Sequence, residues 1–523
     1  MTFDELLGQR AKYDKNQPFV YFNDEVLTFG QVEKIVNKTA KILTGLGVQK
    51  GDHVCLLLPN CLEFLYLWFG LAKIGGVMVP INPSLRGDGL KYIINHSDSK
   101  LIFVHSRLQV PFNFVKSDLR NIKNVVLVGQ DEVAPFASSD LETLLAEASE
   151  GAPPAVPISP GDPLGIIYTS GTTGPPRGAM ISHFNYLHSG QVWLEEVIDY
   201  QPDDVFFTSL PLFHANAQMF TTMGSLLSGR PFVLREKFSA SRFFDEIRQY
   251  KATVFNYIGG ILTMLMKQPP RKDDAQNPIR VTFGGAAPRE IWREFEERFD
   301  LTIIEGYGLT ESGGVSICNP PHDIKVGSIG KTLSFCEVDI FDDNDKQLPV
   351  GETGEIVIRE RVPHSMFIEY YKERDKTKEV WRSGWFHTGD RGYMDPQGYF
   401  YFVDRSKDCI RRRGENISSF DIEKIINSHP SVLEAAAVAV PSDLGEDEVK
   451  VFVVLRENQD LTEEDLLAYC EERMAYFMVP RYVHYTDALP KTPTQRVQKY
   501  KLREFGIGEA WDREKAGYKL KRL

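Results

Sequence analysis

In the N-terminal quarter of the chain, apolar positions alternate between helical and strand spacing. Residues 32–43 place apolar side chains on one face of a helix that Thr28 can cap. The run 52–59 predicts a buried strand, and the short apolar runs 101–104 and 125–128 predict two more. Helices and strands that alternate in this way favour an α/β fold, with a largely parallel sheet covered by helices on both faces.

The most apolar window of the chain covers residues 64–81. It contains Lys73 and the pair Gly75-Gly76, whereas a membrane span needs about 20 uninterrupted apolar residues. The window therefore predicts a buried helix, a glycine break and a short strand, and no transmembrane segment. The first 15 residues carry acidic side chains and lack an apolar core, so they do not predict a signal peptide.

A second, smaller unit is predicted towards the C-terminus. The β-prone run 399–403 is followed by the charged, glycine-containing stretch 406–416. A fresh α+β pattern then begins, with helix 420–427, strand 449–455, helix 462–470 and strand 482–485. We therefore predict two domains, residues 1–403 and residues 404–523.

Composition supports a globular chain with more than one core. The chain has 523 residues, of which 42% are hydrophobic and 25% are charged, and a domain typically has about 100–200 residues. The 60 basic and 72 acidic residues leave a net charge of −12, which disfavours a nucleic-acid partner. Six cysteines without a CxxC pair indicate reduced thiols, so we expect a cytoplasmic protein without a zinc site. The sequence is compatible with a homo-oligomer but defines no oligomeric state.

A loop rich in hydroxyls and glycines follows an apolar strand at residues 166–178. Backbone N–H groups and hydroxyls in such a loop form a donor array suited to a polyphosphate, and Arg177 adds a fixed positive charge. The donors and the glycines between them are Thr169, Ser170, Gly171, Thr172, Thr173 and Gly174. The spacing in this loop does not match the P-loop pattern, which needs Gly-Lys-Ser/Thr, so a P-loop NTPase is not supported. Composition alone is equally typical of a surface loop.

This segment resembles the signature loop of the adenylate-forming superfamily, which includes acyl-CoA synthetases, adenylation domains of peptide synthetases and firefly-type luciferases. The family pattern is Thr-Ser-Gly-Thr-Thr-Gly, two residues and then usually Lys-Gly. The match is complete from Thr169 to Gly174, and Arg177 stands where the family has Lys. The resemblance extends from Thr28 to Leu502, with the further signatures in the family's order.

The segment 306–312 resembles the second family signature. Tyr307 offers a flat face to a purine, Thr310 a hydroxyl to a phosphate, and Glu311 a carboxylate to Mg²⁺, and the resemblance implies the same roles. The preceding segment 284–288 resembles the family's adenine-side loop, so Gly285 and Ala286 are expected beside the base.

Four later positions are assigned by the same resemblance. Asp390 is expected to accept hydrogen bonds from the ribose hydroxyls, and Arg405, at the hinge, is expected near the ribose or phosphate. His214 is expected to gate the acyl and CoA passage, and Gly414 to face the site during thioester formation. Taken singly, these residues are equally typical of turns, surface charges or a structural histidine.

The last family signature ends in Gly-Lys, and its Lys is catalytic for adenylation. Here Gln495 and Arg496 occupy these positions, so Arg496 is the predicted catalytic cation, although Lys491 or Lys499 could substitute. The chain near Arg496 resembles the branch that contains crotonobetaine/carnitine-CoA ligases and related fatty-acid ligases.

The resemblance implies an ATP- and Mg²⁺-dependent ligase that adenylates a carboxylic acid and transfers the acyl group to CoA. It also implies a multi-subdomain N-terminal adenylation domain and a mobile C-terminal domain. The acyl pocket is expected around 256–260, 284–285 and 313–315. A fatty acid, an aryl acid and a betaine-like acid all stay open, and Tyr257 could offer a cation–π face to the last. The alternatives are loading of a carrier-protein thiol, an impaired nucleotide-binding homologue, and a luciferase-like oxidation.

Overall fold

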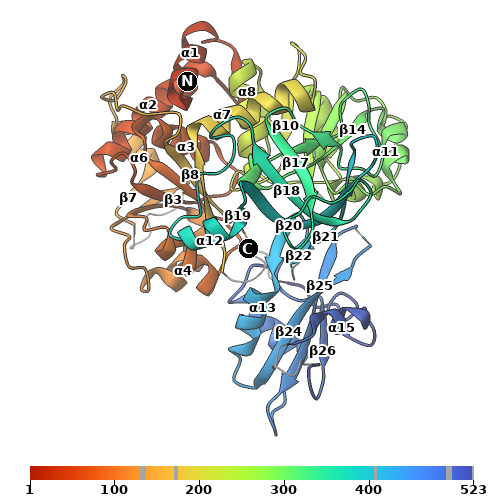
Figure 1. Cartoon of the computed structure of the whole chain (residues 1–523). Coiled ribbons are helices and arrows are strands. Elements are labelled where there is room, and N and C mark those ends of the chain that lie inside the picture. Colours follow the sequence, from red (N-terminus) through yellow and green to blue (C-terminus); the bar gives the residue numbers. More distant parts are fainter. Residues whose placement is uncertain are drawn as a thin grey trace.

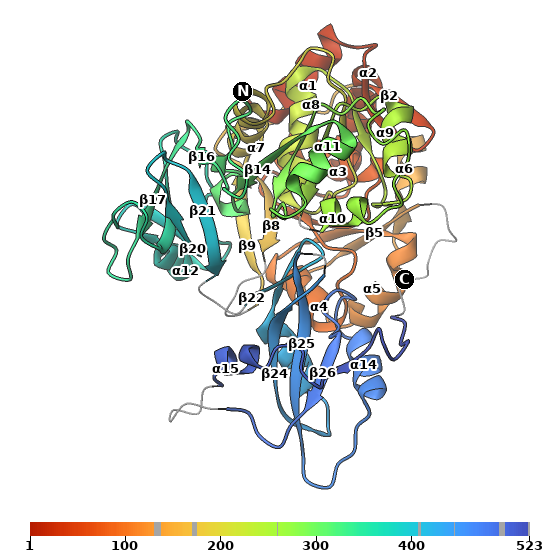
Figure 2. The same cartoon turned by 90° about the vertical axis from the view of Figure 1, so that its right-hand side faces the viewer.

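The computed structural model describes residues 1–129, 137–169, 175–258, 260–405, 409–443, 445–490 and 497–520. Figures 1 and 2 show a large N-terminal body and a small C-terminal body, with β22 (Cys409–Arg412) at the junction between them. The large body contains three sheets and the small one a hairpin and a fourth sheet, among the residues described. The predicted α/β class is confirmed.

Two mostly parallel sheets form the centre of the N-terminal domain. In spatial order, the first contains β7 (Ser139–Asp140), β6 (Asn124–Val128), β5 (Leu101–His105), β3 (His53–Leu57), β4 (Val77–Pro80), β8 (Pro163–Thr169) and β9 (Arg177–Ser182). The second contains β16 (Lys331–Thr332), β15 (Ile317–Cys318), β14 (Thr302–Tyr307), β13 (Val281–Gly285), β12 (Val254–Ile258), β10 (Phe206–Thr208), β11 (Phe232–Leu234), β1 (Pro18–Phe22) and β2 (Glu25–Thr28). The three strands predicted in the N-terminal quarter correspond to β3, β5 and β6.

Helices cover these sheets. Those of the N-terminal domain are α1 (Phe3–Tyr13), α2 (Phe29–Gly45), α3 (Leu62–Ile74), α4 (Gly87–His96), α5 (Gln109–Lys116), α6 (Leu141–Glu147), α7 (His183–Val192), α8 (Met223–Ser228), α9 (Phe243–Tyr250), α10 (Ile261–Met266), α11 (Trp292–Phe299) and α12 (Arg374–Val380). Thr28 caps α2 as predicted, because its hydroxyl accepts a hydrogen bond from the Gln31 N–H group.

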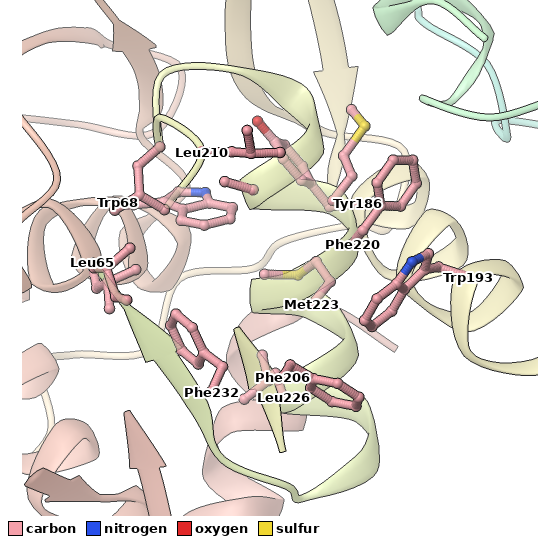
Figure 3. Close-up of a cluster of buried hydrophobic side chains, with 14 of the residues drawn as sticks. Leu65, Trp68, Tyr186, Trp193, Phe206, Leu210, Phe220, Met223, Leu226 and Phe232 are labelled. Atoms are coloured by element: carbon pink, nitrogen blue, oxygen red, sulfur yellow. The ribbon is translucent and has the colours of Figure 1, made fainter. Parts of the chain in front are cut away.

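The apolar window 64–81 forms a buried helix and a strand. Helix α3 is followed by Gly75, whose φ of 70° ends the helix, and by β4. In Figure 3, Leu65 and Trp68 of α3 point into a cluster with Tyr186 of α7, Met223 of α8 and Phe232 of β11. No helix in the described part of the chain is both long and apolar enough to cross a membrane.

A third sheet leads to the C-terminal domain. It contains β17 (Cys336–Phe341), β18 (Gly354–Glu360), β20 (Trp385–Met394) and β19 (Trp381–Arg382), and β21 (Phe400–Arg405) pairs with β20. The pairing continues as far as Arg405, opposite Asp390. The domain boundary predicted between residues 403 and 404 stays a prediction.

The C-terminal domain has one sheet with a separate apolar cluster on each face. Its elements are the hairpin β22 and β23 (Glu415–Ser418), the strands β24 (Val432–Pro441), β25 (Asp447–Leu455), β26 (Tyr482–Tyr485) and β27 (Trp511–Asp512), and the helices α13 (Ser419–Asn427), α14 (Glu463–Glu471) and α15 (Lys499–Glu504). Ala435 and Ala437 of β24 face one cluster, and the alternate residues Ala436 and Val438 face the other.

Candidate active site

One cavity of about 610 Å³ collects segments from both large sheets, the third sheet and the C-terminal hairpin. The strands β8, β13 and β14 end at this cavity, and ligands commonly bind at the carboxyl ends of parallel strands. The predicted site residues that line it are Thr169, Arg177, His214, Gly285, Tyr307, Thr310, Glu311, Asp390 and Gly414. Segments that are far apart in the sequence therefore share one space.

Glu311 is held at the cavity wall by two hydroxyl groups. It lies in the 3-10 turn η4 (Thr310–Ser312) and is 6% exposed. Its Oε1 accepts hydrogen bonds from Thr169 Oγ1 and from Tyr370 Oη, each at 2.9 Å. Burial, and then the neighbouring Glu311 carboxylate, raise the pKa of Tyr370 above its usual range, so the phenol stays a donor. Tyr370 is a site residue that sequence reasoning missed.

Arg177 lies over the ring of Tyr370. Its guanidinium carbon is 5.6 Å from the centre of the Tyr370 ring, and its Nε is 3.8 Å from a carboxylate oxygen of Glu373. The positive charge predicted at the phosphate loop is therefore next to the tyrosine that binds Glu311. The predicted loop residues Ser170, Gly171, Thr172, Thr173 and Gly174 lie outside the described residues.

Tyr307 and Asp390 meet at a second edge of the cavity. The Tyr307 hydroxyl donates a hydrogen bond to Asp390 Oδ2 at 2.8 Å. Asp390 is buried in β20, and its N–H group donates to Thr388 Oγ1 at 3.0 Å. The backbone of Arg405 pairs with that of Asp390, and the Arg405 side chain lies outside the described part of the chain.

The loop predicted beside adenine is tied to a buried carboxylate. Glu305 of β14 accepts hydrogen bonds from the N–H groups of Ala286 and Ala287, at 2.6 and 2.9 Å, and from Tyr257 Oη at 2.5 Å. Ala286 has a left-handed backbone with a φ of 67°. Burial raises the pKa of Glu305 to about 7. Sequence reasoning missed Glu305, although a lone carboxylate in a buried strand was a usable signal.

Only part of the predicted acyl pocket lines the cavity. Ile258, Gly284, Gly314 and Val315 line the cavity. Tyr257 does not line the cavity, because it is fully buried. It packs closely on Gly284, where an added Cβ would lie 2.1 Å from the Tyr257 carbonyl oxygen. The cation–π role suggested for Tyr257 is therefore not supported. Residue 259 lies outside the described chain.

The C-terminal hairpin enters the cavity with Gly414 at its turn. Gly414 has a φ of 79°, and a Cβ there would lie 3.1 Å from Ile258 Cγ2. The neighbouring Glu415 places both carboxylate oxygens 3.1 Å from His214 Nε2, and Asn82 Nδ2 donates to Glu415 Oε1 at 3.4 Å. The hairpin thus contacts the histidine predicted to gate the passage.

The flanks of the predicted catalytic segment lie on the opposite face of the C-terminal sheet. Leu489, Val497 and Leu502 pack on the face of Ala436 and Val438. The hairpin residues Ile410 and Ile417 instead pack on the face of Ala435 and Ala437. Arg496 itself lies outside the described residues.

The residues around Glu311 fit a magnesium ion. No group of three or more His, Cys, Asp or Glu side chains is placed to hold a metal within the described ranges. Mg²⁺ needs few protein ligands, since it commonly keeps several waters and binds one or two carboxylates together with substrate phosphates. One carboxylate flanked by the hydroxyls of Thr169 and Tyr370 is such a donor set.

Comparison with known proteins identifies the family. The profile described as AMP-binding enzyme matches residues 7–371, and the one described as AMP-binding enzyme C-terminal domain matches residues 421–496. A crotonobetaine/carnitine–CoA ligase from Salmonella heidelberg (strain SL476) is 35% identical over 482 residues, covering 91% of this chain and 93% of the relative.

Solved structures share the fold along the whole chain. A double mutant of o-succinylbenzoate CoA synthetase (MenE) from Bacillus subtilis, bound with the product analogue OSB-NCoA, has a TM-score of 0.84 and 24% identity, covering 95% of this chain and 98% of that one. The same enzyme with the acyl-adenylate intermediate OSB-AMP has a TM-score of 0.69 and 24% identity, covering 96% of this chain and 99% of that one. Amide bond synthetase McbA from Marinactinospora thermotolerans has a TM-score of 0.85 and 23% identity, covering 97% of this chain and 99% of that one. The resemblance seen in the sequence is confirmed: the chain belongs to the AMP-binding enzyme family, within the adenylate-forming superfamily that includes the acyl-CoA synthetases.

Proposed function

We propose that the protein is an AMP-forming acid–thiol ligase. It converts a carboxylic acid, ATP and CoA into acyl-CoA, AMP and pyrophosphate. The observation that carries this proposal is the meeting of separate signatures around one cavity, where Thr169 bonds Glu311 and Tyr307 bonds Asp390. The family membership and the CoA-ligase relatives support ATP and CoA as co-substrates.

The first half-reaction activates the acid. A carboxylate is a poor electrophile, so one of its oxygens attacks the α-phosphorus of ATP, the bond to the β-phosphate oxygen breaks, and acyl-AMP and pyrophosphate form. The loop 169–177 and Thr310 bind the phosphates, and Arg496 screens the charge that develops on the α-phosphate. Tyr307 lies beside the base and Asp390 binds the ribose hydroxyls.

Glu311 would hold Mg²⁺ in this half-reaction. When bound, the ion would supply neutralisation of charge on the phosphate oxygens. Thr169 and Tyr370 keep the Glu311 carboxylate directed by donating to the same oxygen. Both donors come from segments other than η4, so the carboxylate is oriented from outside its own turn.

The second half-reaction transfers the acyl group to the thiol of CoA. The thiol sulfur attacks the acyl carbon, AMP leaves, and the thiol proton is released. The Gly414 hairpin, which enters the cavity and contacts His214 through Glu415, supports this arrangement as the thioester-forming one. The higher TM-score against MenE with OSB-NCoA than against MenE with OSB-AMP agrees with it.

The acyl group would occupy the apolar end of the cavity. Phe220 and Phe283 line this end with their rings edge to face and centroids 5.4 Å apart, next to Val315 and Ala215. Asn216 is the polar member of this wall, and its Oδ1 accepts a hydrogen bond from Asn256 at 2.9 Å. This wall favours an acid with an uncharged tail over a betaine-like acid.

The test is a panel of fatty, aryl and betaine-like acids, assayed for acid-dependent pyrophosphate exchange into ATP. CoA, a carrier-protein thiol and an amine are then offered as acceptors, and products are identified by mass. We expect exchange with at least one acid and a thioester with CoA. Binding of ATP without exchange would overturn the ligase proposal, and a product only with the carrier protein or the amine would overturn CoA as the acceptor.

A further inference from the structure

A loop of the C-terminal domain contacts a short helix of the N-terminal domain. The loop joins β24 to β25, and the helix is α10, which lies on the side facing the C-terminal domain in Figure 2. At the end of α10, Lys267 Nζ donates a hydrogen bond to the carbonyl oxygen of Asp443 at 3.1 Å.

Glu446 joins this loop to the turn of the hairpin. Its two carboxylate oxygens accept hydrogen bonds from the Gly414 N–H group at 3.1 and 3.2 Å. One buried carboxylate therefore links the hairpin turn to the loop whose Asp443 contacts α10. Arg411 lies near, with its Nε 3.9 Å from Glu446 Oε1.

The close fit of the loop agrees with a specific contact. Gly445 has a φ of 78°, and a Cβ added there would lie 3.2 Å from Pro288 Cγ and 4.0 Å from Thr263 Oγ1. A side chain at this position would be strained and would push the loop away from α10. Gly445 thus lets the loop lie close to Pro288 and Thr263 of the N-terminal domain.

We propose that Glu446 is a positioning residue for thiol transfer. It fastens the Gly414 hairpin to the loop that contacts α10, and so holds the domain arrangement in which the hairpin lines the cavity. The proposal rests on the proposed function. Leu489 and Val497, on either side of the Arg496 segment, pack on the opposite face of the C-terminal sheet, so turning that face to the cavity breaks the contact. Glu446 therefore serves the second half-reaction and not the first.

The experiment compares the two half-reactions in full-length Glu446→Gln. Adenylation is read as pyrophosphate exchange, and thiol transfer as single-turnover thioester formation from supplied acyl-adenylate and CoA. Loss of a hydrogen bond to a charged group predicts a drop in thiol transfer of about tenfold to a hundredfold, with exchange changed by less than about twofold. Glu457→Gln, at an exposed glutamate of the same domain, is the matched control and keeps both rates.

Lys267→Ala is the second variant, because Lys267 is exposed and its loss does not threaten folding. It removes the bond to Asp443 and should lower thiol transfer in the same selective way, by a smaller factor. An equal loss in both half-reactions, or an unchanged thiol-transfer rate in both variants, overturns the role of Glu446 while the ligase assignment stands. Absence of pyrophosphate exchange in the wild type overturns both.

Discussion

Thr169 Oγ1 donates a hydrogen bond to Glu311 Oε1 at 2.9 Å, although the two residues are 142 positions apart. Thr169 ends β8 in one large sheet, and Glu311 follows β14 of the other. The end of the loop predicted to bind phosphate and the proposed magnesium ligand are therefore joined directly. The two residues adjoin different sheets, so the position of Glu311 relative to Thr169 depends on how the two sheets pack.

Replacing Glu311 by Gln should abolish most of the adenylation activity. The amide keeps the size of the side chain but loses the charge that would hold Mg²⁺. We expect pyrophosphate exchange to fall by about a hundredfold or more, the usual loss for a group that stabilises transition-state charge. The half-saturating Mg²⁺ concentration should rise as well, measured by titrating Mg²⁺ at saturating ATP.

Tyr370→Phe is the matched control, because it removes one donor to Glu311 and keeps the carboxylate. It should lower exchange by about tenfold, as expected for one hydrogen bond to a charged group. An unchanged Mg²⁺ dependence in Glu311→Gln would argue against Glu311 as the ligand.

Arg496→Ala should separate the half-reactions in the opposite sense to Glu446→Gln. The flanks of the Arg496 segment lie on the sheet face opposite to the hairpin, so we expect Arg496 and Gly414 to serve different steps. Exchange should fall by about a hundredfold or more, whereas thioester formation from supplied acyl-adenylate should change little. Arg496→Lys keeps the charge and should retain most of the exchange activity. Equal losses in both steps for Arg496→Ala would contradict the division of roles.

Glu305 should make the stability of the protein depend on pH. Burial raises its pKa from 4.5 to about 7. Between these two values the folded chain holds a proton that the unfolded chain has released, so stability falls as pH rises. The contribution of Glu305 to the free energy of unfolding is complete below about pH 4.5 and is lost as the pH passes through about 7. Urea unfolding at pH 5, 6, 7 and 8 should show the free energy of unfolding of the wild type, relative to Glu305→Gln, decreasing across this range.

The same substitution should affect ATP more than the acid. Glu305 holds the loop predicted beside adenine through two backbone N–H groups, and an amide cannot accept from both in the same way. We expect the KM for ATP to rise and the KM for the acid to stay within about twofold. Glu457→Gln should reproduce the wild-type pH profile of stability and both KM values. If stability depended on pH in the same way in Glu305→Gln and in the wild type, Glu305 would not be the titrating group.

The C-terminal domain should depend on a buried ion pair. Arg412 is 1% exposed, its Nε is 2.6 Å from Glu448 Oε2, and its guanidinium donates to the carbonyl oxygens of Phe477 and Val479. Burial lowers the pKa of Arg412 to about 10. Arg412→Ala leaves a buried carboxylate without its partner and should cost about 3–5 kcal/mol, measured by thermal unfolding. Arg456→Ala, at an exposed arginine, should stay within about 0.5 kcal/mol.

Some features of the fold depend only on neighbouring residues, and the sequence predicted these. The cap at Thr28, the strand corresponding to β3 and the helix and strand on either side of Gly75 follow from spacing and backbone preference over a few positions. The signature segments are equally local, because close approach to phosphates demands glycines and hydroxyls in an unbroken run. Tyr307, Glu311 and Asp390 were identifiable before the fold was known because their segments resemble the family signatures, and all three line the cavity.

By itself, then, the sequence determined the α/β class, the local elements and the identity of the contiguous site segments. The tertiary structure alone brings Glu305, Tyr370 and Glu446 to their contacts, and each is a single residue without a motif of its own. Their partners lie elsewhere in the chain, as Glu311 lies 59 positions from Tyr370. Strand order and domain docking choose such partners, and no periodicity along the chain carries that information.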